Sequence, residues 1–140
     1  MKTIRVMIAD DHALVRESIK AILSNEEDME IVAVAEDGKQ AIELSVAHRP
    51  DVVVMDISMP RLDGIRSTSL IRSDAPDTSV VILSMHVNAT LVQQAIKMGA
   101  KGYVLKGRAA DELAAAVRAA NEGKLYISAD IPPTYLNPIR

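Results

Sequence analysis

The feature that most constrains the fold of this chain is a regular alternation of strand-like and helix-like segments. Short apolar runs are each followed by a longer segment whose apolar residues recur at helical spacing, as at offsets of four, seven and eight from Val15. The pattern predicts strands at 3–9, 30–35, 51–56, 79–84 and 101–105, and helices at 12–24, 38–48, 64–73, 88–98 and 109–122. Such alternation is typical of an α/β domain with a parallel sheet.

The composition of the runs indicates where each strand lies in the sheet. The runs at 51–56 and 79–84 are continuously apolar between their ends, as expected for central parallel strands covered on both faces. The run at 101–105 is short and flanked by Lys101 and Lys106, which suits an edge. Five strands joined by right-handed crossovers give a three-layer α/β/α sandwich. The doubly wound, flavodoxin-like order 2-1-3-4-5 places the first and third strands side by side.

Proline and glycine mark the ends of the predicted elements and of the domain. Pro50 disfavours helical geometry at the residue before it, and Gly99 is a natural helix cap. After Gly123 the sequence contains three prolines and no periodic pattern. We therefore expect a domain at residues 1–122 and a linker or tail at residues 123–140, with no output domain, since chains below about 40 residues rarely fold alone.

The composition excludes several classes of function. The 140 residues include no Phe and no Trp, so the core must be aliphatic. A net charge of −3 with both signs interspersed argues against nucleic-acid binding by this domain. Without cysteine there are no disulfides and no zinc–sulfur sites. No apolar run approaches the ~20 residues of a membrane span, and no apolar signal segment opens the sequence. These observations predict a soluble, cytoplasmic domain.

Four of the predicted strands end at polar residues suited to phosphate or metal chemistry. These are Asp10 and Asp11, Asp56, Ser84 and Lys106. Because ligands of open parallel sheets bind outside the carboxyl ends of the strands, the side chains should share one site. Clustered carboxylates with oxygen-only surroundings suit Mg²⁺. A carboxylate nucleophile, an ammonium and a hydroxyl match phosphoryl transfer to Asp.

Each of these residues also has a simpler structural interpretation. Asp10 and Asp11 could cap the following helix, where their charge suits the helix dipole. Lys106 could protect a sheet edge, and Ser84 could begin a loop. Asp56 follows a fully apolar run, and a buried charge without a purpose would be costly there. The combination therefore favours the metal and phosphoryl interpretation.

Several short motifs, in this order and spacing, resemble one known family. Residues 3–122 are similar to the receiver domain of two-component response regulators. The motifs are Asp10-Asp11 after the first strand, Asp56 after Val-Val-Val-Met, Met59-Pro60 with Gly64, Ser84, and Lys-Gly-Tyr-Val-Leu-Lys at 101–106. The chain further resembles the subfamily whose output is a LuxR-type helix-turn-helix, at Asp-Asp-His (10–12), at Lys106-Gly107 in place of Lys-Pro, and at Leu-Tyr-Ile-Ser (125–128).

The resemblance implies which residues carry the chemistry. Asp56 is the expected phosphoacceptor, and Lys106 is expected to pair with the phosphoryl group. Asp10, Asp11 and Asp56 are expected to hold Mg²⁺ together with the backbone carbonyl of Ser58.

The resemblance also implies a switch. Ser84 matches the hydroxyl that moves toward the phosphoryl oxygen, and Tyr103 matches the aromatic side chain that rotates inward behind it. Tyr103 could instead be a half-buried strand residue. His86 could orient water for dephosphorylation or have no such role. Pro60 and Gly64 are interpreted as turn residues that support the acceptor loop.

The expected function is a switch rather than a metabolic enzyme, although the domain would assist its own phosphorylation and dephosphorylation. A sensor histidine kinase would donate the phosphoryl group, and the surface at 86–106 would change to control an output such as transcription. One alternative is a pseudo-receiver, a docking module that is never phosphorylated. Another is an Asp-nucleophile phosphatase, which needs a second acid/base and a cap. Homodimerisation on phosphorylation stays open, and no contact with nucleic acid or membrane is expected.

Overall fold

The computed structural model describes residues 2–59 and 63–136, so Pro60 of the predicted motif and the last four residues of the tail lie outside the described residues. Each predicted strand and helix is present within one residue of its expected ends. In chain order the elements are β1 (Ile4–Ala9), α1 (Ala13–Ser24), β2 (Met29–Ala35), α2 (Gly38–His48), β3 (Val52–Asp56), α3 (Gly64–Asp74), β4 (Ser79–Ser84), α4 (Ala89–Lys97), β5 (Gly102–Leu105), η1 (Lys106–Arg108), α5 (Ala109–Asn121), β6 (Tyr126–Ile127) and η2 (Pro133–Leu136).

The strands form one parallel sheet in the order β2-β1-β3-β4-β5-β6. The flavodoxin-like order of the first five strands is confirmed, but the predicted number of strands is one too low. Tyr126 and Ile127 pair with Gly102 and Tyr103, so β5 is not an edge strand as expected. Two residues are too few to show the alternation that identifies a strand in a sequence.

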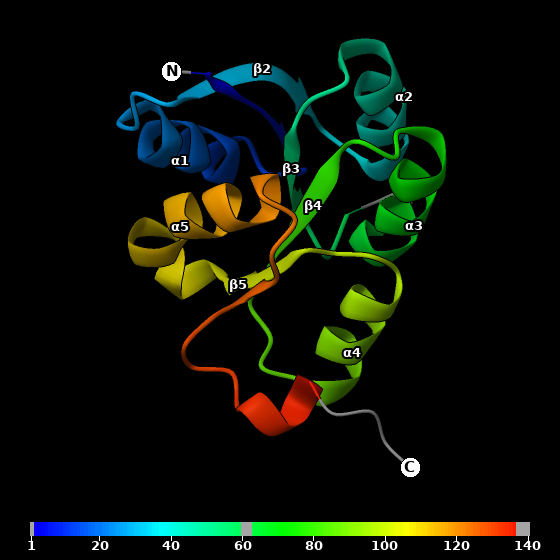
Figure 1. Ribbon diagram of the computed structural model, residues 1–140, viewed down its shortest axis with the longest axis vertical. Coiled ribbons are helices and arrows are strands. Elements are labelled where there is room, and N and C mark those ends of the chain that lie inside the picture. Colours follow the sequence, from blue (N-terminus) through cyan, green and yellow to red (C-terminus); the bar gives the residue numbers. More distant parts are fainter. Residues whose placement is uncertain (1, 60–62, 137–140) are drawn as a thin grey trace.

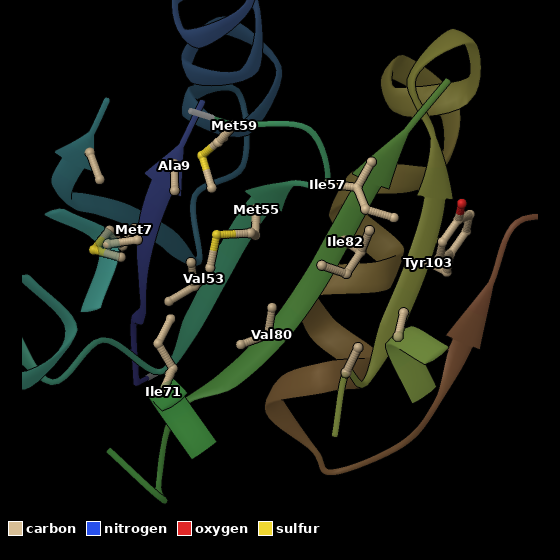
Figure 2. Packing of buried hydrophobic residues seen from close by; sticks show 14 of the residues in the cluster. Met7, Ala9, Val53, Met55, Ile57, Met59, Ile71, Val80, Ile82 and Tyr103 are labelled. Carbon is tan, nitrogen blue, oxygen red and sulfur yellow. The ribbon is translucent and has the colours of Figure 1, made fainter. Parts of the chain in front are cut away.

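The sheet separates two apolar clusters, because successive side chains of a strand point to opposite faces. Helices α1 and α5 cover one face, and α2, α3 and α4 cover the other (Figure 1). On the second face Met7, Val53, Met55, Ile82 and Tyr103 belong to one buried cluster (Figure 2). The core is aliphatic as predicted, with Tyr103 as its one fully buried aromatic side chain among the described residues.

The register of the strands aligns their carboxyl ends. Ala9 pairs with Met55, and Asp56 pairs with Leu83. Further along the sheet, Ser84 pairs with Leu105. The polar residues at or just after these strand ends therefore lie along one edge of the sheet.

The ends of the helices follow the predicted signals. Arg49 takes a left-handed conformation (φ 48°) directly before Pro50 and ends α2. Gly99, with a φ of 109°, follows the last turn of α4, and a Cβ there would also meet the side chain of Arg72.

Part of the segment predicted as a linker or tail is folded onto the domain. Beyond β6, Ser128 and Ile131 are buried. The short helix η2 packs against α4, as seen where the red end of the chain meets α4 (Figure 1). The segment has no period in its sequence because single residues, rather than one face of a regular element, make the contacts. We name residues 126–136 the strap.

Among residues 2–59 and 63–136, no helix combines the length and apolarity needed to cross a membrane.

Candidate functional site

Three carboxylates meet at the carboxyl ends of β1 and β3. Asp10 directly follows β1, and Asp56 is the last residue of β3, the strand beside it. Both are almost fully buried, with 0% and 2% of their surface exposed. One ligand atom each from Asp10, Asp11, His12 and Asp56 lies within 4.8 Å of the others. The predicted clustering of the three aspartates is therefore present in the structure.

Lys106 reaches this cluster from the end of β5. Its Nζ lies 3.1 Å from Asp56 Oδ1 and 3.7 Å from Asp10 Oδ2. The side chain is about one-fifth exposed, so its stem is largely covered while its ammonium group faces the acids. One ammonium group thus lies between two buried carboxylates, and its single positive charge only partly compensates their negative charge.

The two buried carboxylates retain unused acceptor capacity. Asp10 Oδ1 accepts a hydrogen bond from the His12 amide at 2.8 Å, and Asp56 Oδ1 accepts one from the Ser58 amide at 3.2 Å. The other oxygen of each, Oδ2, accepts no hydrogen bond from any residue that the structure describes. Buried oxygens without a donor are costly, and they suit a hard cation that takes oxygen ligands. The donor set therefore fits Mg²⁺.

The surroundings of Asp56 change its acidity. Burial raises the pKa of Asp56 above its ordinary value, and the neighbouring charge of Asp10 raises it further. Lys106 and the Ser58 amide oppose this rise in pKa without cancelling it. A divalent cation at the cluster would favour the ionised, nucleophilic form of Asp56.

Ser84, His86 and Tyr103 are linked beside the carboxylates. Ser84 is fully buried at the end of β4, and its Oγ accepts a hydrogen bond from the His86 amide at 3.0 Å. The Tyr103 hydroxyl donates to the His86 carbonyl oxygen at 3.0 Å. Burial raises the pKa of Tyr103, while Ser84 opposes the rise. The ring of Tyr103 is fully buried, rather than half-buried as its simpler interpretation expected.

Two histidines, His86 and His12, lie near the site. His86 contributes its backbone to this chain of contacts, while its exposed side chain lines a cavity of about 520 Å³ with Ser58 and Arg66. The sequence did not indicate a contact for His12, but its Nδ1 lies 3.1 Å from Asp11 Oδ1. His12 directly follows the Asp pair and is the N-cap residue of α1.

Gly64 has a different role from the turn residue that was predicted. Its φ is not positive, so no special backbone conformation requires a glycine here. Instead, a Cβ at Gly64 would lie 2.3 Å from the Asp56 carbonyl oxygen and 2.8 Å from Ile57 Cα. The first turn of α3 therefore packs directly against the backbone of the acceptor residue, and only glycine permits this approach.

Arg16 is a site neighbour that the sequence did not indicate. Its guanidinium donates a hydrogen bond to the Asp10 carbonyl oxygen at 2.8 Å and lies 3.6 Å from Glu36 Oε1. In a sequence, an arginine in the first turns of a helix normally indicates a solvent-exposed charge. The contact of Arg16 with the end of β1 becomes apparent only in the folded structure.

A sequence profile of the response regulator receiver domain matches residues 6–118. The chain belongs to the response regulator receiver family. This confirms the resemblance inferred from the motifs. The fold comparison agrees, since a crystal structure of a LuxR-family two-component response regulator from Aurantimonas sp. SI85-9A1 has a TM-score of 0.88 and 35% identity over 93% of each chain.

Further relatives support the LuxR-type assignment. The receiver domain is 43% identical over 124 residues to the transcriptional regulatory protein DegU of Brevibacillus brevis, a match that covers 89% of this chain and 52% of DegU. A DNA-binding response regulator of the LuxR family from Staphylococcus aureus aligns with a TM-score of 0.78 and 27% identity, over 84% of this chain and 98% of that one. This chain spans about half the length of DegU.

Proposed function

We propose that this receiver domain is a Mg²⁺-dependent phosphoacceptor switch whose acceptor is Asp56. The observation that carries the proposal is the pair of buried carboxylates, Asp10 and Asp56, each with one unused oxygen and one shared ammonium group. Asp10, Asp11, Asp56 and the backbone carbonyl of Ser58 would hold Mg²⁺. The metal would neutralise the cluster and polarise a phosphoryl oxygen.

The chemical step is an exchange of one bond to phosphorus for another. A carboxylate oxygen of Asp56 attacks the phosphorus of a phosphohistidine in the sensor kinase. The new O–P bond forms as the N–P bond breaks, and the departing imidazole keeps the electron pair and takes up a proton. Lys106 stabilises the negative charge on one phosphoryl oxygen while the phosphoryl group is transferred. Hydrolysis of the resulting acyl phosphate by water resets the switch.

The signal would leave the site through Ser84 and Tyr103. A phosphoryl group adds about −1.5 to −2 charge and strong acceptor oxygens. The Ser84 hydroxyl would exchange its contact with the His86 amide for a phosphoryl oxygen. Because the Tyr103 hydroxyl is bonded to the His86 carbonyl, the β4–α4 loop and the ring of Tyr103 would shift together, changing the surface at 86–106.

The partners follow from this role. The donor is a sensor histidine kinase, the setting is the cytoplasm, and the output is transcriptional control. The similarity to DegU, a transcriptional regulatory protein, supports this output. That residues 1–140 make no contact with DNA stays a prediction. A similar chain is described as a DNA-binding response regulator, which counts against this prediction. Dimerisation on phosphorylation stays open.

The direct test is the intact mass of the protein after incubation with acetyl phosphate, with and without Mg²⁺. We expect one added phosphoryl group in the wild type that requires Mg²⁺ and is absent in Asp56→Asn. Asp77→Asn, the same change at an exposed position at the opposite ends of the strands, should behave as the wild type.

Two other results would favour the alternatives. Absence of both the adduct and Mg²⁺ binding in the folded protein would overturn the proposal in favour of a docking module. Sustained turnover of small phosphate esters would indicate a phosphatase.

A further inference from the structure

Glu112 is a buried carboxylate that lies outside the proposed phosphoacceptor site. It is in the first turn of α5 and is 6% exposed. Its Oε1 accepts a hydrogen bond from the Ser128 hydroxyl, and its Oε2 accepts one from the Ala129 amide at 3.1 Å. Both donors therefore come from the strap. We name Glu112, Ser128 and Ala129 the clasp.

Ser128 connects the clasp to the backbone of β5. Its amide donates to the Tyr103 carbonyl oxygen at 2.9 Å, which continues the pairing of β5 with β6. Its Oγ accepts a hydrogen bond from the Leu105 amide at 2.9 Å. One hydroxyl thus donates to Glu112 and accepts from Leu105, a combination that only a hydroxyl side chain provides at this position.

The clasp holds the chain on both sides of Lys106. Leu105, which bonds to Ser128, is the residue before Lys106. On the other side, Arg108 Nε lies 3.8 Å from Glu112 Oε2 and 3.6 Å from Asp130 Oδ2. A groove of about 620 Å³ is lined by Ser84 and Lys106 of the site and by Asp130 of the strap. The strap therefore borders the phosphoacceptor site itself.

We propose that Ser128 and Glu112 are positioning residues for Lys106. The clasp fixes the end of β5, and this places the Lys106 ammonium where it meets the phosphoryl group on Asp56. The inference rests on the proposed phosphoacceptor function. A lysine side chain has many rotamers, so the direction of its stem depends on a fixed backbone. Displacement of a catalytic group by about 1 Å slows a reaction that depends on orientation.

The test compares Ser128→Ala with Ser128→Thr, which keeps the hydroxyl. Glu112→Gln is a milder second variant that keeps the side-chain volume and one acceptor oxygen, and Ser24→Ala is a matched control at an exposed position. Three quantities are measured: the rate of phosphoryl uptake from acetyl phosphate, the affinity for beryllium trifluoride as a phosphoryl mimic, and the affinity for Mg²⁺. The ¹³Cε resonance of Lys106 is recorded without any ligand.

In Ser128→Ala we expect phosphoryl uptake to slow about tenfold and affinity for the mimic to fall, because orientation contributes rate factors of this size and more. Mg²⁺ affinity should be unchanged, since the aspartates hold the metal, and Ser128→Thr should restore the wild-type values. The Lys106 resonance should shift in Ser128→Ala and in Glu112→Gln.

Loss of Mg²⁺ affinity in parallel with phosphoryl uptake would show a general disruption and overturn the inference. An unchanged Lys106 resonance in Ser128→Ala would overturn it as well. Failure of the wild type to take up a phosphoryl group would instead contradict the proposed function, and the Lys106 resonance would still decide whether the clasp positions that side chain.

Discussion

Two regions of the receiver domain bury carboxylates and satisfy them differently. At the carboxyl ends of β1 and β3, which we call the rim of the sheet, Asp10 and Asp56 each have one oxygen without a hydrogen-bond donor. The two carboxylates share the ammonium group of Lys106. In the clasp, both oxygens of Glu112 accept hydrogen bonds from the strap. Buried polar groups normally find partners, so the unsatisfied pair indicates a ligand site and the satisfied carboxylate indicates a structural contact.

The comparison predicts opposite effects of removing the charge at the two places. Loss of Glu112 leaves the buried Ser128 hydroxyl without its acceptor, so it should destabilise the fold. Loss of Asp56 removes a repulsion, so it should stabilise the metal-free protein. The following substitutions are ordered from the largest expected effect to the smallest.

The largest effect is expected for Glu112→Leu. The buried Ser128 hydroxyl would lose its acceptor, at about 1–3 kcal/mol for an unsatisfied buried group, and the Ala129 amide would lose its hydrogen bond. We expect the free energy of unfolding to fall by about 3 kcal/mol in urea titrations. Glu43→Leu, the same change at an exposed position of α2, should stay within about 0.5 kcal/mol of the wild type. Equal losses of unfolding free energy in Glu112→Leu and Glu43→Leu would contradict the structural role of Glu112.

Next in size is Lys106→Met, measured in the absence of divalent cations. This change keeps an apolar stem but leaves Asp10 and Asp56 uncompensated, and breaking a buried ion pair is strongly destabilising. Since Lys106 is partly exposed, we expect a loss of about 2 kcal/mol, smaller than for a fully buried pair. Mg²⁺ should recover part of this loss. Lys101→Met, at the opposite end of β5, provides the comparison.

Asp56→Asn should have the opposite sign. The raised pKa of Asp56 means that the folded protein favours the protonated acid, so ionisation lowers stability above the folded-state pKa. Without metal, the variant should therefore be more stable than the wild type at neutral pH, by about 1 kcal/mol, an ordinary size for one substitution. The stability advantage of the variant should shrink as the pH falls toward the unfolded-state pKa of about 4. A stability advantage of Asp56→Asn that grew at low pH would contradict the raised pKa of Asp56.

The smallest effect is expected at the surface ion pair of Arg118 with Asp28 and Glu26. Hydrogen bonding and charge from Arg118 lower the pKa of Asp28. A lowered pKa gives stability that is present above the unfolded-state pKa and is lost as the pH falls through the folded-state pKa. Arg118→Ala should lower the melting temperature slightly at neutral pH, and less in high salt or acid, because exposed pairs contribute little. A loss as large as that of Lys106→Met would contradict this ranking.

The sequence was informative wherever a strand end and a reactive side chain coincide. Asp10, Asp56, Ser84 and Lys106 follow recognisable apolar runs, and parallel strands must bring such ends together. Their clustering could therefore be predicted, although their roles in phosphorylation could be inferred only from the family resemblance.

The clasp and the strap could not be predicted in the same way. Glu112 lies in the first turn of an alanine-rich helix, where an acidic residue is favoured by the helix dipole and needs no partner. β6 has two residues and no readable period. The need for glycine at position 64 was likewise hidden, because it comes from the approach of α3 to the Asp56 backbone and not from a local turn.

The most direct test of the contrast between the two carboxylate sites is a Mg²⁺ titration by calorimetry of the wild type, Asp56→Asn and Glu112→Gln. Unsatisfied oxygens at the rim predict that the wild type and Glu112→Gln bind Mg²⁺ with the same affinity and that Asp56→Asn binds it much more weakly. Equal Mg²⁺ affinity in all three proteins, or a loss confined to Glu112→Gln, would contradict the assignment of Asp56 to the metal site.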